Sequence, residues 1–161
     1  MAGLSAKWER WYPIGAGATS LIVVYLFGDS LIAAVGQKRI NAQALYGAVF
    51  NWAAIQAGFT VGIYALLVGH AGEFITRIKG TAAFERFLGY IENAAVASFV
   101  LATLTVPMIA LEPDIVRKNS VGFISFSVWL ALFVTTFLAF VRVARIFVII
   151  SRVRDRQEYS G

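Results

Sequence analysis

Apolar residues dominate four long stretches of the chain, and short polar segments separate them. The stretches cover about residues 12–35, 44–72, 87–111 and 121–141. About 20 apolar residues in a helix cross the hydrocarbon layer of a bilayer, and a helix satisfies its backbone groups without water. The pattern therefore predicts an all-α integral membrane protein, with one four-helix transmembrane bundle formed by the whole chain, residues 1–161.

Polar residues at the edges of these stretches set the expected helix ends. Thr81 follows Gly80 and is expected to cap a third helix running from Ala82 to about Leu111. The second helix is expected to continue beyond the membrane through residues 73–79. The fourth should start near Val121 and run to about Arg156, with residues 142–156 as a basic juxtamembrane helix. The second and fourth helices thus extend into the cytoplasm.

Composition supports membrane insertion, and the positive residues suggest an orientation. The chain is 59% hydrophobic and only 14% charged, with net charge +5, and soluble domains are nearer a quarter charged. Eight Lys and Arg lie on the N-terminal arm, the 73–86 hairpin and the tail beyond residue 150, against four on the other two turns. Positive residues favour the cytoplasmic side, so both termini are expected there. The expected partners are anionic lipids rather than nucleic acid, and the expected location is a bacterial inner membrane.

Small residues recur along one side of the second stretch. Their steps of three or four residues place them on one face of a helix. They are Gly47, Asn51, Ala54, Gly58, Gly62, Ala65, Gly69 and Gly72. Such faces let membrane helices approach closely, so the pattern predicts a packing seam that receives another helix. Asn51, on this seam, would form a hydrogen bond between helices or line a pore; Gln56 lies off the seam.

Asp29 is the acidic residue within the first stretch. A carboxylate inside a membrane is costly, which makes it a candidate for binding an ion, transferring a proton or lining a wet path. The alternative is a position near the outer edge of the hydrocarbon, about 25 Å along a helix that starts at Tyr12. There it would pair with Lys38 or Arg39.

Glu92 should lie at the same depth as Arg142 and Arg145 on the fourth helix. An unpaired charge at that depth is expensive, so we expect Glu92 to pair with one of the two arginines and hold the helices in register. The alternative is a polar gate at the inner mouth of a path.

Two further patterns mark the fourth helix. Phe126, Phe133, Phe140 and Phe147 recur every seven residues, either as knobs that fill the glycine seam or as a lipid-facing stripe. The tail carries Arg152, Arg154 and Arg156. These arginines are expected to contact anionic lipid, or alternatively to dock a cytoplasmic partner.

The chain shows no catalytic motif, so we expect no enzyme activity. It has no cysteine and a single histidine, and no metal site or other cofactor is expected. The leading hypothesis is a homo-oligomeric pore, channel or membrane-permeabilising effector. A non-catalytic subunit or partner-binding protein of a larger membrane complex is the alternative, and a small proton-coupled transporter a lesser one.

Overall fold

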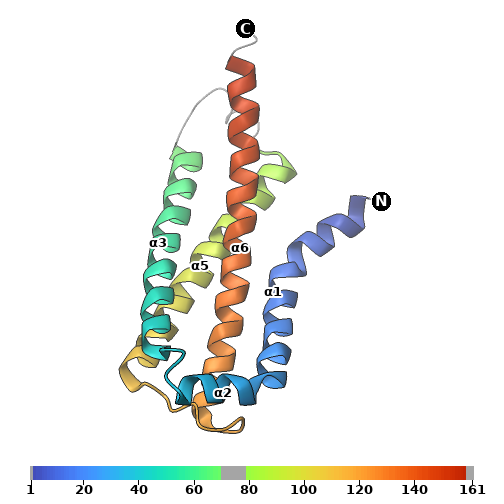
Figure 1. Cartoon of the computed structure of the whole chain (residues 1–161). Coiled ribbons are helices and arrows are strands. Elements are labelled where there is room, and N and C mark those ends of the chain that lie inside the picture. The colour runs from blue at the N-terminus through green and yellow to red at the C-terminus, as the bar shows by residue number, and fades with distance from the viewer. Residues whose placement is uncertain (1, 70–78, 159–161) are drawn as a thin grey trace.

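The computed structural model of the chain describes residues 2–69 and 79–158, with side chains described at 11–69 and 79–150. Within these residues every regular element is a helix. The helices are α1 (Ala2–Leu26), α2 (Gly28–Gly36), α3 (Ala42–Gly69), α5 (Ala82–Leu111) and α6 (Val121–Glu158). The long helices alternate in direction, and α2 lies across one end of the bundle (Figure 1).

Among the described residues, three helical segments are long and apolar enough to cross a membrane: Ala42–Gly69, Ala82–Leu111 and Val121–Ile150. A fourth crossing is available only if the bent pair of Trp11–Leu26 and Gly28–Gly36 counts as one span. The chain is thus an all-helical protein with the helices of a membrane protein.

The first stretch, predicted as one span over residues 12–35, is instead broken between α1 and α2, whose axes differ by 70°. Gly28, at the break, is buried against the connection between α5 and α6. A Cβ there would lie 2.8 Å from Lys118 Cε and 2.9 Å from Phe123 Cζ. The sequence predicted one helix over this stretch and the structure has two, because apolar composition does not report this tertiary contact.

The ends of α5 and α6 agree with the sequence prediction. Thr81 has an extended backbone, and its side chain accepts a hydrogen bond from the Phe84 backbone N–H at 3.3 Å. Gly80, just before it, has a φ of 88°, a conformation that glycine adopts without strain. Ser120 caps α6 in the same way, accepting from the Phe123 N–H at 3.2 Å. The predicted extension of the second helix falls mainly on residues 70–78, outside the described residues.

The helices pack in the order α3, α5, α6 and α1. The most extensive contact joins α3 to α5, while α6 lies against both α5 and α1. Aromatic rings fill the wider space between α3 and α6. Trp52 on α3 contacts Phe133, Phe137 and Phe140 on α6, with ring centroids 5.4–6.2 Å apart. Large side chains therefore join two helices whose backbones stay apart.

The buried side chains form two clusters along this bundle. The first, near α2, includes Tyr46, Leu101, Phe126 and Trp129. The second, towards the other end, includes Ile63, Phe87, Ile91 and Val143.

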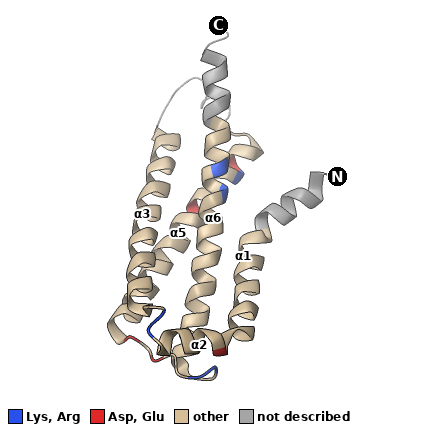
Figure 2. Ribbon diagram, viewed as in Figure 1, with Lys and Arg blue, Asp and Glu red and all other residues tan. Residues whose placement is uncertain are grey.

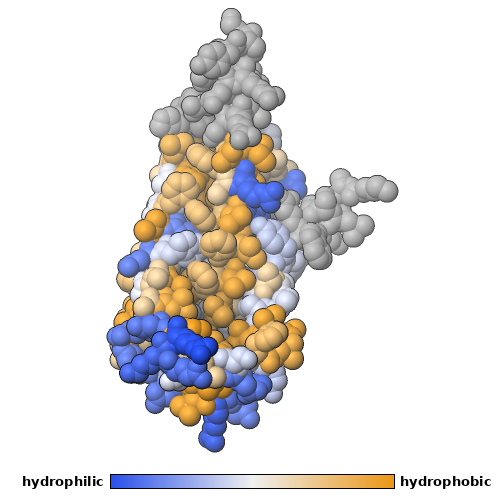
Figure 3. Space-filling model, viewed as in Figure 1, coloured by the Kyte–Doolittle hydropathy of each residue, from blue (hydrophilic) through white to orange (hydrophobic). Residues whose placement is uncertain are grey.

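Charged positions lie at the end formed by α2 and the adjoining turns and in a second group further along α5 and α6, with a long uncharged section between the two groups (Figure 2). On the face shown in Figure 3, apolar side chains cover much of the middle, and hydrophilic ones cover the end formed by α2 and the adjoining turns. We call this end, with the turn at residues 37–41 and the connection at 112–120, the loop end. This distribution suits a helix bundle surrounded by lipid.

Candidate functional site

The small residues of the predicted seam on α3 point away from the rest of the bundle. All of the described seam positions are exposed except Gly47, which is half-buried. A Cβ added at Gly47, Gly58, Gly62 or Gly69 would meet no atom within 4 Å. We call this surface, made of Gly47, Asn51, Ala54, Gly58, Gly62, Ala65 and Gly69, the glycine face. Gly72 lies outside the described residues.

A different set of α3 residues contacts the neighbouring helices. Ala53, Ala57 and Thr60 are 0–3% exposed, and their steps of four and three residues define a second small-residue stripe. On α5, Ala94 and Ser98 are also fully buried. The packing seam predicted from the glycines is therefore not used within the subunit, because alanine and threonine already allow α5 to approach.

Asn51 is exposed on the glycine face and makes no hydrogen bond with another described residue. It lies roughly 14 Å from the start of α3 at Ala42, counting about 1.5 Å per residue over nine residues. That distance is about half the thickness of a hydrocarbon layer, which is roughly 30 Å. The amide is thus the hydrogen-bonding side chain that this face presents to its surroundings.

Gln56 takes the opposite role and is 2% exposed inside the subunit. Its Nε2 donates to the backbone carbonyl of Thr136 on α6 at 3.4 Å. Nearby, the Trp129 indole N–H donates to Thr105 Oγ1 at 2.8 Å, which links α6 to α5. These buried polar contacts, together with close-packed apolar side chains, fill the interior between α3, α5 and α6.

Asp29 forms an ion pair with Lys118, with 2.8 Å between Oδ2 and Nζ. The Asp29 side chain is 83% exposed, and the pair lies at the loop end, where α2 meets the connection before α6. The Lys118 ammonium also sits over the Tyr25 ring, 5.6 Å from its centroid. The structure pairs Asp29 with Lys118 rather than with Lys38 or Arg39, and its depth in a membrane stays a prediction. The bend at Gly28 brings Lys118 there instead.

Glu92 does not pair with Arg142 or Arg145 among the ion pairs of the described residues. Arg142 is 7% exposed and stacks on the Tyr90 ring, with its Cζ 3.8 Å from the centroid. Residues 90 and 92 point about 200° apart on a helix, so the contact with Tyr90 turns Glu92 away. The predicted pair was wrong for this reason, although α5 and α6 are joined at this depth through Arg142.

Glu92 instead borders a groove of about 210 Å³ between α3 and α5. Its other lining residues are Thr60, Val61, Tyr64, Ile91, Ala95 and Val96. The carboxylate is exposed at the edge of this mainly apolar groove.

The phenylalanines that recur every seven residues on α6 contact aromatic residues of α3 rather than glycine. Phe126 is 2% exposed within the first cluster, and Phe140 contacts Phe59 at 5.7 Å between centroids. Neither expected role, filling the glycine seam or facing lipid as a stripe, matches these contacts. The side chains of Arg152, Arg154 and Arg156 lie outside the described side chains, so their lipid or partner contacts stay a prediction.

Comparison with protein-family models, with curated proteins and with solved structures finds no match to this chain.

Proposed function

We propose that the protein acts as a homo-oligomer in the membrane, in which copies meet through the glycine face of α3 and form a polar path beside Asn51. The observation that carries the proposal is an exposed amide within a row of small residues, on a helix able to span a membrane. The function is that of a pore or a membrane-permeabilising effector, without catalysis.

The amide supplies the first argument for association. A polar side chain facing hydrocarbon lacks the hydrogen bonds that water would give it, and inter-helix hydrogen bonds in membranes contribute roughly 0.5–2 kcal/mol each. In a symmetric assembly, the Asn51 side chains of neighbouring copies come to the same depth. A second copy of the chain therefore provides both a donor and an acceptor for the amide.

The shape of the glycine face supplies the second argument. A Cβ built at any of its four described glycines would meet no neighbouring atom within 4 Å, so the face admits another helix at short range. A glycine destabilises a helix by about 1 kcal/mol relative to alanine, and packing inside the subunit does not offset this loss on the glycine face. Contact with another helix would offset it, because closely spaced backbones gain van der Waals packing.

A path between subunits fits this arrangement better than one within a subunit. Buried side chains fill the space between α3, α5 and α6, including Ile91, Leu101 and Val143 at 0% exposure. The side chains of the glycine face are small, so copies around a common axis leave room along α3. The Asn51 amides then provide a polar ring in that space.

The remaining hypotheses differ in what occupies the glycine face or carries the proton. In a larger membrane complex, a helix of another protein would lie on this face. In a proton-coupled transporter, Glu92 would be the acid that carries the proton, because Asp29 forms an ion pair with Lys118 at the loop end. A bacterial inner membrane, with both termini in the cytoplasm, is part of the proposal and is based on the distribution of Lys and Arg.

Ion flux from sealed liposomes carrying the purified protein tests the proposal. Flux should be measurable for the native chain and changed by Asn51→Leu. Asn93→Leu is the matched control, because Asn93 is also exposed but lies on α5. Equal ion flux from the two variants would contradict a path lined by Asn51. The absence of flux from the native protein, once its insertion is confirmed, would contradict it as well.

Disulfide cross-linking tests the interface separately. The chain has no cysteine, so Gly58→Cys places a single thiol on the glycine face. Oxidation should produce a covalent dimer in liposomes, whereas Val96→Cys, at an exposed position of α5, should not. Absence of the Gly58→Cys dimer would overturn self-association and favour a different protein as the occupant of the face.

A further inference from the structure

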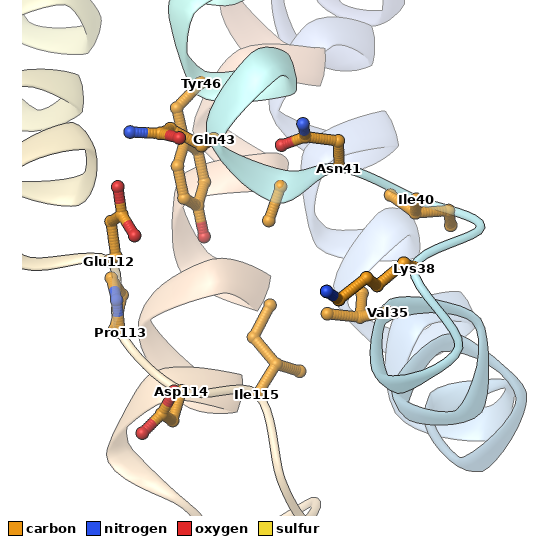
Figure 4. A pocket seen from close by; sticks show the side chains of 11 residues that line it. Val35, Lys38, Ile40, Asn41, Gln43, Tyr46, Glu112, Pro113, Asp114 and Ile115 are labelled. Carbon is orange, nitrogen blue, oxygen red and sulfur yellow. The ribbon is translucent and has the colours of Figure 1, made fainter.

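A cavity of about 550 Å³ opens at the loop end, away from the glycine face. The end of α2 and the following turn form one side, the start of α3 forms the roof, and the segment after α5 forms the other side (Figure 4). Its volume lies within the usual range for small-molecule sites, about 300–1,000 Å³. The cavity is therefore large enough for a small polar ligand.

Tyr46 is the buried polar group of this cavity. Its side chain hangs from α3 with the hydroxyl pointing into the space between the two sides (Figure 4). The residue is 1% exposed, and its Oη has no hydrogen-bond partner among the described residues. Leaving a buried hydroxyl unpaired is costly, and a polar group bound in the cavity would satisfy it.

The aromatic core fixes the direction of that hydroxyl. The Tyr46 ring packs edge-on against Trp129, with centroids 4.8 Å apart, and against Phe126 at 6.2 Å. These contacts prevent the ring from turning to find a partner elsewhere. The hydroxyl is therefore held towards the cavity before any ligand arrives.

Opposite charges stand on the two sides of the Tyr46 hydroxyl. Lys38 extends its amine from the α2–α3 turn, and Glu112 presents its carboxylate from the end of α5 (Figure 4). Neither forms an ion pair with another described residue. Asp114 borders the same side, with its carboxylate directed away from the Tyr46 hydroxyl (Figure 4). The cavity thus separates a cationic side from an anionic side.

The backbone is strained at the two residues that carry these charges. Lys38 has a φ of 58° and Glu112 a φ of 41°, and they are the non-glycine residues with positive φ in the described chain. Such conformations are uncommon outside glycine and persist where surrounding structure imposes them, frequently at ligand sites. Both residues border the same cavity, which connects the strain with the placement of the charges.

Close packing holds the Glu112 side in place. Ile115 is 8% exposed within the first core cluster. A Cβ at Gly122 would collide with the backbone carbonyl oxygen of Asp114, so glycine there lets the segment lie directly on α6. On the other side, Asn41 Oδ1 accepts from the Ala44 N–H at 3.0 Å and anchors the turn to α3. The cavity is thus preformed.

We infer that this cavity binds a small zwitterion, with its ammonium group against Glu112, its anionic oxygens against Lys38, and the Tyr46 hydroxyl bonded between them. Charge-assisted hydrogen bonds to both ends of one molecule give selectivity over a simple cation or anion. The apolar residues Val35, Ile40 and Pro113 complete the lining.

Two sources carry this chemistry at a membrane surface. A free solute with an amine and an acid group enters from the water, and the head group of phosphatidylethanolamine enters from the lipid. Both present an ammonium and an anionic oxygen to the same residues, so the experiment uses one probe for each.

The soluble probe is O-phosphoethanolamine, added to the purified protein in phosphatidylcholine nanodiscs. Binding should raise the thermal unfolding midpoint and alter tryptophan fluorescence, since Trp129 contacts Tyr46. The lipid probe is a nanodisc containing phosphatidylethanolamine, compared with one containing phosphatidylcholine alone. Stabilisation by either probe supports the zwitterion site and identifies its source; no effect of either overturns it.

Tyr46→Phe is the decisive variant, because it removes only the unpaired hydroxyl. It should weaken binding of the effective probe by about tenfold or more without lowering the midpoint of the ligand-free protein. Tyr64→Phe, a tyrosine on the same helix but outside this cavity, is the matched control and should bind normally. Unchanged binding by Tyr46→Phe would overturn the role of the hydroxyl.

The charged sides have their own variants. Glu112→Gln and Lys38→Met should each weaken binding, whereas Glu85→Gln, at an exposed position near the start of α5, should not. Equal effects of all three would indicate general electrostatics and contradict a defined zwitterion site.

Discussion

Replacing Gly17 with alanine should loosen the packing of α1 on α6, whereas the same change at Gly58 should leave the fold of a single subunit intact. Both glycines lie inside apolar helices, Gly17 on α1 and Gly58 on α3. Their surroundings differ: Gly17 is buried, and Gly58 is exposed with open space around it. The pair therefore separates a glycine needed by the fold from one left free on the surface.

The contact at Gly17 sets the magnitude. An added Cβ would overlap Thr135 Oγ1 and lie 2.9 Å from the backbone carbonyl oxygen of Ala131. The threonine can rotate, at the loss of its own 2.9 Å hydrogen bond to Ala131, but the carbonyl cannot. Overpacking of this kind costs about 1–3 kcal/mol. At Gly58 there is no overpacking cost, because an added Cβ would meet no atom within 4 Å.

The comparison cancels the helix-propensity effect. Alanine stabilises a helix by about 1 kcal/mol relative to glycine, and both variants gain this equally. The difference between their unfolding free energies should therefore be the overpacking cost alone, about 1–3 kcal/mol. The Gly17→Ala variant should be the less stable of the two.

SDS titration in mixed micelles, at a protein dilution where the chain is monomeric, gives the two unfolding free energies. Circular dichroism and tryptophan fluorescence should follow the same transition. Equal stability of the two variants, or a less stable Gly58→Ala variant, would refute the assignment of Gly17 to the α1–α6 contact and of Gly58 to a free surface.

Two further variants test polar contacts. Thr105→Val should lower the unfolding free energy by about 1–3 kcal/mol, because it leaves the buried Trp129 N–H without its acceptor. SDS titration measures this change. Thr103→Val, at an exposed position, is the control and should leave the unfolding free energy unchanged. Asp29→Asn should change the unfolding free energy by less than about 1 kcal/mol, because the Asp29 carboxylate is 83% exposed in its ion pair with Lys118. If this variant abolished ion flux from liposomes, the acid would be needed for transport.

The helical class and several helix ends could be predicted from local sequence. The α5 cap at Thr81 and the start of α6 at Val121 depend on side chains within one turn of the helix end. The apolar lengths of α3, α5 and α6 likewise indicate membrane spans by themselves. These features need no knowledge of the neighbouring helices.

The orientation of each helix in the bundle could not be predicted in the same way. On α3, the glycine stripe and the stripe of Ala53, Ala57 and Thr60 both offer small residues at helical spacing. Only packing shows that α3 buries the second and leaves the first exposed. The Glu92 pair failed for a related reason: depth along a helix was matched, but not the direction around it.

The loop-end cavity depends on contacts between segments far apart in the chain. Lys38, Tyr46 and Glu112 carry no shared motif, and each is unremarkable where it stands in the sequence. The close contact at Gly122 and the strained backbone at residues 38 and 112 bring them together. The sequence by itself predicted helices long and apolar enough to span a membrane, because a helix pairs its own backbone groups without water. Only the tertiary structure decided which faces stay exposed and where a cavity forms, since both depend on side-chain packing between helices.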